Sequence, residues 1–285
     1  MLTGVASIFQ KKTLFREHTL ELVTMVALFG MCLTLPAFFL FDRSSLTQYA
    51  LGIIFLQAIL VAAATFLFAK SLRHLPITIA APILVFSPLL SALLGFLFLG
   101  ESLSKIQITG IVILVIGANL LESHVRSLWT PFVDAWRGKH TRYMLGAVVL
   151  YSCAVLLERR IVSPASIGGF GVPPALFLGV EHVIMAAIYL PMLFFFHDGY
   201  VSIRHGIKTA GPIILLIALL TVGYRLSGSY ALSYPEGKVG LFAAIKRTSA
   251  LVAVAVGGNL FREEHVTRRV VGCAVMVIGA AMILF

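Results

Sequence analysis

Long apolar runs separated by short polar segments dominate the chain. A membrane-spanning helix needs about 20 mostly apolar residues, because its length must match the thickness of the hydrocarbon core. Continuous runs favour helices, since the strands of a membrane β-barrel alternate apolar and polar residues. The pattern predicts an all-α integral membrane protein with nine complete spans, at residues 20–41, 47–69, 76–99, 106–121, 143–162, 173–196, 211–233, 238–260 and 267–285.

The two halves of the chain repeat one another. One constant offset aligns residues 97–121 with residues 259–284 and pairs Glu101 with Glu263. Each segment also carries two glycines spaced by two helical turns, so both glycines lie on one helix face, where another helix can approach closely. The repeat predicts two related halves, each built from the same order of helices.

The start of the chain fits the same repeat. Residues 7–15 echo residues 155–163, so the first 14 residues correspond to the C-terminal part of the span at 143–162. We therefore expect five helices per half, with the first one truncated to a stub in this chain. An odd number of helices per half inverts the second half in the membrane. Inverted repeats are typical of secondary transporters, whose site lies at the repeat interface near the midplane.

The longest polar stretch, residues 123–142, divides the halves. Trp129 and Trp136 lie in it with two further apolar residues at helical spacing, while charged residues occupy the other faces. Two interpretations are open: a short helix lying in the membrane interface, or a loop anchored by two tryptophans. In either case the predicted domains are a first repeat at 1–122, an interfacial linker at 123–142 and a second repeat at 143–285.

Composition and charge narrow the class of protein. Hydrophobic residues make up 59% of the 285 residues and charged residues only 12%, with a mean hydropathy of +0.99. A soluble domain has about twice that charged fraction. The formal net charge is +10, but the basic residues stand in short loops that flank apolar runs, so they do not form a nucleic-acid-binding face. The expected surroundings are a lipid bilayer, by default a bacterial-type plasma (inner) membrane, because no organelle-targeting segment is visible.

Motifs for catalysis are missing from the sequence. It has no glycine-rich phosphate loop, no Ser/His/Asp grouping in a polar context and no histidines at metal-ligand spacing. Cys32, Cys153 and Cys273 all stand inside apolar runs, where cysteine acts as a small buried hydrophobe. We therefore expect no enzyme, no metal and no cofactor.

Charged residues inside the predicted spans are the main functional signal. They are Glu181, Arg225, Lys246 and Arg247, with His182 next to the first of them. A Lys or Arg at the centre of a span costs roughly 2.5–3.5 kcal/mol, so such residues need a partner, a wet cavity or an anionic ligand. Their equivalents in the first half are apolar. This asymmetry points to a ligand site and not to scaffolding.

Two arrangements of these charges are open. In the first, Glu181 neutralises Arg225 and leaves Lys246 and Arg247 to bind an anion, with a guanidinium fork and an ammonium point charge. In the second, Lys246 extends to the membrane surface and Arg247 pairs with Glu181. The first arrangement gives the expected substrate-binding residues: Tyr224, Arg225, Lys246, Arg247 and Ser249.

Two further pairs of residues have expected roles. Glu181 and His182 are expected to act as a proton carrier or counter-ion, as buried carboxylates and imidazoles do in pumps. A structural Glu181–Arg225 pair is the alternative. Glu101 and Glu263 stand at the turns that join the last two helices of each half, just before the N-cap candidates Ser104 and Thr267, so a structural role in the turn is expected.

Residues 87–122 and 245–284 resemble the drug/metabolite transporter superfamily, specifically its EamA-type ten-helix members. The resemblance implies two inverted five-helix halves, a central cavity and alternating access without ATP. The Lys246–Arg247 pair also resembles the Lys-Arg pair in the ninth helix of plastid sugar-phosphate translocators, which implies that both residues bind the anion. Two features depart from the family: the first helix is mostly missing, and the positive-inside rule places the C-terminus outside, whereas the family keeps both termini in the cytoplasm.

The sequence thus predicts a secondary transporter for a small organic metabolite bearing a phosphate or carboxylate, moving by alternating access with proton or exchange coupling. One alternative is an exporter of amino acids or drugs with the same fold, in which the cations are structural. Another is a membrane subunit for assembly or lipid handling that does not transport. No nucleic-acid partner is expected, and the sequence leaves the oligomeric state open.

Overall fold

The computed structural model describes residues 2–15, 17–75, 77–100, 104–120 and 138–240, and eleven positions beyond them: 242, 246, 249, 256, 271, 272, 274, 275, 278, 279 and 282. Within these residues the backbone forms helices, turns and loops, and no strand. The prediction of an all-α protein is confirmed for this part of the chain. Most of the last two predicted spans, most of the linker, and both Glu101 and Glu263 lie outside the described residues.

The described helices follow in chain order: α1 (Leu2–Leu14), α2 (Thr19–Thr34), α3 (Ala37–Leu40), α4 (Gln48–His74), α5 (Ile77–Leu99), α6 (Lys105–Leu120), α8 (Lys139–Val162), the 3-10 turn η1 (Ala165–Ile167), α9 (Pro174–Phe196) and α10 (Tyr200–Ser233). Four segments are long and apolar enough to cross a membrane, namely Thr19–Leu40, Gln48–His74, Pro174–Phe196 and Tyr200–Ser233. The chain is therefore an integral membrane protein.

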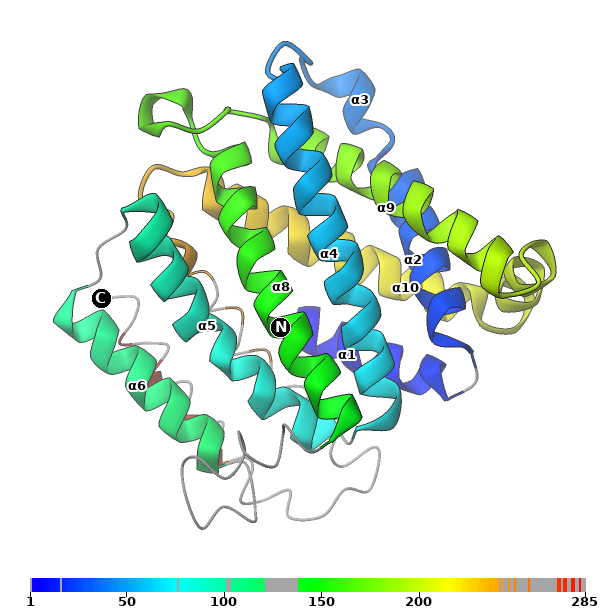
Figure 1. Ribbon diagram of the computed structural model, residues 1–285, viewed down its shortest axis with the longest axis horizontal. Helices are drawn as coiled ribbons and strands as arrows, with labels where there is room; N and C mark the ends of the chain where they lie inside the picture. The colour runs from blue at the N-terminus through cyan, green and yellow to red at the C-terminus, as the bar shows by residue number, and fades with distance from the viewer. Residues whose placement is uncertain are drawn as a thin grey trace.

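The helices of the two halves are packed into each other, not side by side as separate bundles. Helix α4 of the first half packs along α8 of the second, and α8 also contacts α5. Helix α2 packs against α9 and α10, and α1 lies on α10 (Figure 1). Helices from both halves therefore surround a shared space. A site at the interface of two repeats requires this kind of packing.

Four boundaries differ from the predicted spans, and one of them is the end of α4, which lies at His74 and not at residue 69. The span at 20–41 is interrupted after Thr34, because Pro36 has no backbone N–H to continue the hydrogen-bond ladder, and α3 resumes at Ala37. Helix α8 begins at Lys139 inside the predicted linker. Helix α10 begins at Tyr200, well before the predicted start at 211.

The early start of α10 has a packing reason. Residues 200–210 are too polar to be read as a span, but they form an amphipathic helical extension. Gly206 and Ala210 are buried, and Ile203 packs against the main hydrophobic core. A hydropathy pattern alone finds the lipid-facing part of a helix and misses an extension of this kind.

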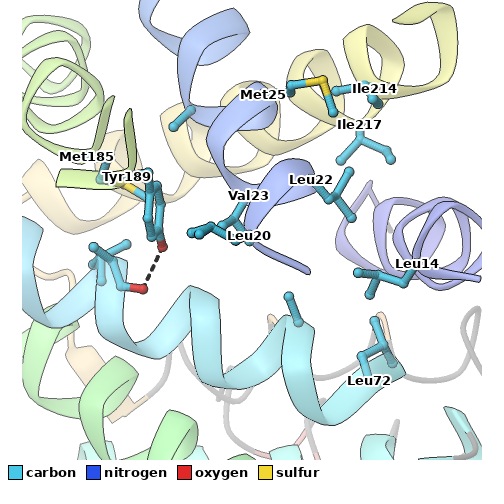
Figure 2. Packing of buried hydrophobic residues seen from close by; sticks show 14 of the residues in the cluster. Leu14, Leu20, Leu22, Val23, Met25, Leu72, Met185, Tyr189, Ile214 and Ile217 are labelled. Atoms are coloured by element: carbon cyan, nitrogen blue, oxygen red, sulfur yellow. Dashed lines mark hydrogen bonds between the residues drawn. The ribbon is translucent and has the colours of Figure 1, made fainter. Parts of the chain in front are cut away.

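The main core joins α1, α2, α4, α9 and α10 (Figure 2). Tyr189 of α9 is almost fully buried, and its hydroxyl donates a hydrogen bond of 2.6 Å to the carbonyl oxygen of Ala62 in α4. Figure 2 shows the ring pointing at α4, between Met185 and the α2 residues. A buried tyrosine hydroxyl needs such a partner, so this bond fixes α9 against α4 at the level of the central cavity.

A buried basic residue caps the end of the third helix in each half. The Lys11 ammonium donates to the carbonyl of Leu75 just after α4, at 3.2 Å. The Arg159 guanidinium donates to the carbonyls of Leu232, Tyr234 and Pro235 at the end of α10, the last two at 2.7 and 2.9 Å. Cations at helix C-termini satisfy the last carbonyls and match the helix dipole.

These caps correct one prediction and support another. The positive-inside rule counts Lys11 and Arg159 as basic residues on opposite sides of the membrane, yet they are only 6% and 7% exposed. Their charges interact with helix ends inside the protein. The positive-inside count that places the C-terminus outside therefore loses one basic residue on each side of the membrane. The two cations also occupy matching positions in the alignment of residues 7–15 with 155–163, and each caps the third helix of its own half. This correspondence supports the internal repeat.

Candidate functional site

A cavity of about 140 Å³ lies where α1, α2, α4, α5, α8, α9 and α10 meet. Helices α2 and α5 give it an apolar wall that includes Val23, Val26 and Leu84. Polar side chains gather on the side of α1, α8 and α10. Four of the predicted substrate-binding residues line this cavity together with His182: they are Tyr224, Arg225, Lys246 and Ser249.

Arg225 forms ion pairs with two carboxylates. Its Nη1 donates to Oε1 of Glu181 in α9 at 2.6 Å, and its Nη2 lies 3.5 Å from Oε2 of Glu158 in α8. Ser229, one turn further along α10, donates its hydroxyl to Oε1 of Glu158 at 2.5 Å. All of these groups are buried or nearly so. We call Glu158, Glu181 and Arg225 the carboxylate–arginine cluster.

Glu158 is the residue that the sequence analysis missed. It stands directly before Arg159 and Arg160 near the end of an apolar run, so it was not distinguished from the surface charges beside it. The repeat carried a usable signal, because the alignment of 7–15 with 155–163 pairs Glu158 with the polar residue Gln10, which lines the cavity. A polar residue at the same internal position of both halves marks a position that faces the cavity region.

Glu181 and His182 are neighbours in sequence but have different partners. Glu181 bonds Arg225, and its second oxygen makes no hydrogen bond within the described residues. The Nδ1 of His182 lies 2.8 Å from the carbonyl oxygen of Leu178. Because a carbonyl only accepts, Nδ1 carries the proton and Nε2 is left as an acceptor. His182 therefore forms a separate polar group on the cavity wall and does not act as the partner of Glu181.

Lys246 lies in the central region and does not extend to the membrane surface. Its ammonium is 5.1 Å from the centre of the Tyr224 ring and 5.9 Å from that of Phe242, both within the range of cation–π attraction. The Ser249 hydroxyl donates to the backbone carbonyl of Lys246 at 2.6 Å, so its oxygen remains an acceptor on the cavity wall. The arrangement in which Lys246 extends to the interface is therefore wrong.

Other predicted residues lie elsewhere. Ser227 and Tyr230, which stand near Arg225 in the sequence, are exposed on α10. The Ser104 hydroxyl accepts a hydrogen bond from the backbone N–H of Gln107, and the Ser104 backbone N–H donates to Oε1 of Gln107, so Ser104 is confirmed as the N-cap of α6. The remaining predicted residues, Arg247, Glu101, Glu263 and Thr267, lie outside the described residues.

Gly30 of α2 gives the His182 ring its space. A Cβ at this position would lie 2.3 Å from Cδ2 and 2.7 Å from Nε2 of His182, whose ring is held by Leu178. We expect Gly30→Ala to lower the free energy of unfolding by about 1–3 kcal/mol, the usual cost of overpacking a core. Thermal unfolding of the purified protein in detergent measures this loss.

The matched control is Gly52→Ala. A Cβ there meets nothing within 4 Å, so the same substitution in α4 should be neutral or stabilising by about 0.5–1 kcal/mol. Adding His182→Ala to Gly30→Ala should recover part of the lost stability, because the clashing ring is gone. Equal effects of the two glycine substitutions would show that His182 does not occupy this position.

Residues 1–122 match the EamA-like transporter family. No curated protein matches the sequence. A solved structure described only as "Crystal structure of protein" aligns with 100% of this chain and 97% of its own chain, with a TM-score of 0.62 and 14% sequence identity. At this identity the likeness shows a common fold and nothing about activity.

Proposed function

We infer the function from the family match. Over residues 1–122 the chain belongs to the EamA-like transporter family, and it is a membrane transporter for a small molecule. We propose that its substrate is a small organic anion bearing a phosphate or carboxylate, carried by alternating access between the two halves. The observation behind this proposal is that Lys246 and Arg225 line the same central cavity, with Tyr224 and Ser249 beside them.

The cavity offers an anion two kinds of contact. Two unit charges 4 Å apart attract by about 4 kcal/mol at the effective dielectric near a protein surface, so a single ammonium makes a substantial contribution. The apolar wall from α2 and α5 can receive the carbon part of an organic molecule. In this proposal Lys246 is the main anion ligand and Arg247, its neighbour in sequence, is a second one.

Arg225 has a different role from Lys246 in the proposed anion site. Its guanidinium is already held by Glu181 and Glu158, so it contacts the anion only when one carboxylate gives way. Glu181 is its counter-ion, and His182 supplies an acceptor on the cavity wall for a hydroxyl or N–H of the substrate. The proposed anion site therefore contains Lys246, whose ammonium faces aromatic rings, and Arg225, whose guanidinium is shared by two carboxylates.

Thermal unfolding in detergent against a ligand panel tests the proposal. The panel contains glycerol phosphate, inorganic phosphate, malate, neutral amino acids and cationic drugs. A ligand at 100 times its dissociation constant stabilises the folded protein by about 2.7 kcal/mol. We expect glycerol phosphate or malate to give such a shift, and Lys246→Ala to abolish it because the main cation is removed.

The control is Lys105→Ala, which removes a lysine from an exposed position at the start of α6. This variant should respond to anions as the wild type does. Stabilisation by amines or drugs alone would instead favour the exporter alternative, with Lys246 in a structural role. A wild-type protein stabilised by no member of the panel would contradict the proposed function.

A further inference from the structure

The carboxylate–arginine cluster contains two acidic groups and one basic group, and this unequal number has no role in the proposed anion site. Two buried carboxylates, Glu158 and Glu181, share the single guanidinium of Arg225. Two carboxylates that contact one guanidinium in a buried site resist ionising at the same time, so such pairs tend to hold one proton between them. The geometry of this cluster is therefore that of a group that can exchange a proton.

Among the described residues, three charged groups act on Glu158: Arg225 on α10, Glu181 on α9 and Lys246 beyond α10. Among the described residues of this site, two carboxylates therefore face two cations, and the formal sum is zero when all are ionised. An anion that pairs with Lys246 leaves the two carboxylates with a single cation, Arg225, in a place with little water. Uptake of one proton by a carboxylate restores the balance and frees Arg225 to contact the anion.

Glu158 is better placed than Glu181 to exchange this proton. Its oxygen is 3.5 Å from the guanidinium, against 2.6 Å for Glu181, so it loses less when that contact breaks. Its other oxygen accepts from Ser229, a bond that a protonated carboxyl can keep. Glu158 is 7% exposed, whereas Glu181 is fully buried.

The position of Glu158 along α8 also fits this role. The next residue, Arg159, lines a second cavity of about 500 Å³ at the end of the bundle where α8 ends, whereas Arg225 lines the central cavity. Glu158 thus lies in the layer between the two cavities. A carrier that opens alternately on its two sides exposes this layer to each side in turn, as proton exchange requires.

We propose that Glu158 binds a proton together with the anion, so that the transporter is a proton–anion symporter. This inference rests on the proposed function. A hydronium ion gives its proton to Oε2 of Glu158, an O–H bond forms, and the contact with Nη2 of Arg225 breaks. Arg225 then turns to the anion. When the anion leaves on the other side, Arg225 returns to Glu158, and the proton passes back to water. Linkage makes each ligand raise the affinity for the other by the same factor.

Infrared spectroscopy of the protein in lipid bilayers tests the proton site directly. A protonated buried carboxyl has a carbonyl stretch separate from those of amides and carboxylates. We expect this band to appear as the pH falls, to appear at higher pH in the presence of glycerol phosphate, and to vanish in Glu158→Gln. The exposed residue Glu236 gives a matched control, since Glu236→Gln should leave the band unchanged. A band that survives in Glu158→Gln, or one lost only in Glu181→Gln, overturns the assignment.

Transport in proteoliposomes tests the coupling. With one proton per anion, a difference of one pH unit across the membrane should raise the steady-state accumulation of glycerol phosphate about tenfold, because one unit is a tenfold ratio of proton activity. Glu158→Gln should still bind glycerol phosphate in the unfolding assay but accumulate it without regard to pH. Wild-type accumulation that ignores the pH difference overturns the inference.

The two proposals fail in different ways. If no anion of the panel stabilises the wild type, the proposed function fails, and the symport inference fails with it. If anions bind but no carboxyl band titrates, the proposed function stands and Glu158 is a structural residue. If anions bind and the band titrates without responding to glycerol phosphate or malate, Glu158 holds a proton but does not couple it to the substrate, and the inference is overturned.

Discussion

Arg225→Ala should lower the free energy of unfolding by about 3–5 kcal/mol, the typical cost of removing one partner from a buried ion pair. The substitution leaves the carboxylates of Glu158 and Glu181 buried without the guanidinium that now contacts both. Thermal or denaturant unfolding of the purified protein in detergent measures the loss. The same variant should also lose anion stabilisation, because Arg225 lines the cavity.

A combined variant separates the charge effect from packing. Arg225→Met together with Glu158→Gln and Glu181→Gln removes all three charges while keeping similar volumes. Replacement of a buried charged cluster by neutral residues is often neutral or stabilising, so this variant should regain most of the stability that Arg225→Ala loses. If Arg225→Ala unfolds within about 0.5 kcal/mol of the wild type, as surface substitutions do, the cluster is not buried as the structure describes.

Arg159→Ala should cost about 3 kcal/mol or more. Its guanidinium is the donor for the carbonyls of Leu232, Tyr234 and Pro235 at the end of α10. A hydrogen bond to a charged group contributes about 1.5–3 kcal/mol, and each buried acceptor left without a donor carries a penalty of about 1–3 kcal/mol. Unfolding in detergent measures the loss, and amide hydrogen exchange should show that the C-terminal turn of α10 opens more readily.

The neighbouring arginine provides the control for this prediction. Arg160 is exposed, so Arg160→Ala should change stability by no more than about 0.5 kcal/mol. Lys11→Ala should have an effect of the same sign as Arg159→Ala but smaller, because Lys11 donates to the single carbonyl of Leu75 at the longer distance of 3.2 Å. A larger loss at Arg160 than at Arg159 would contradict the capping role.

Hydropathy predicted the bounds of two helices closely. The predicted spans at 173–196 and 76–99 agree with α9 and α5 to within one residue. The same method placed the start of α10 at 211, because residues 200–210 bury only one face and leave the other polar. Hydropathy averages around the helix, so it cannot separate an amphipathic extension from a loop.

Charge inside a span singled out residues that lie together in the structure, and the Glu181–Arg225 pair of the first predicted arrangement is present. Glu181, Arg225 and Lys246 were singled out because ionised groups in hydrocarbon need partners, and two of them form a direct ion pair. Glu158 went unrecognised because it stands next to Arg159 and Arg160. Glu158 and Arg159 are buried whereas Arg160 is exposed, and this depends on the rotation of α8 about its axis, which is decided by packing against α4, α5 and α10.

The sequence by itself determined that this protein is a helical membrane protein and which ionisable residues lie inside spans, because both follow from the energetic cost of polar groups in a bilayer. The repeat of its halves was also readable, because the chain aligns with itself at one constant offset. The tertiary structure alone decided that Lys11 and Arg159 cap helix ends, that Lys246 lies over Tyr224, and that Glu158 shares Arg225 with Glu181. These contacts join residues on different helices, and their distances depend on how those helices rotate and cross, which no periodicity along one helix contains.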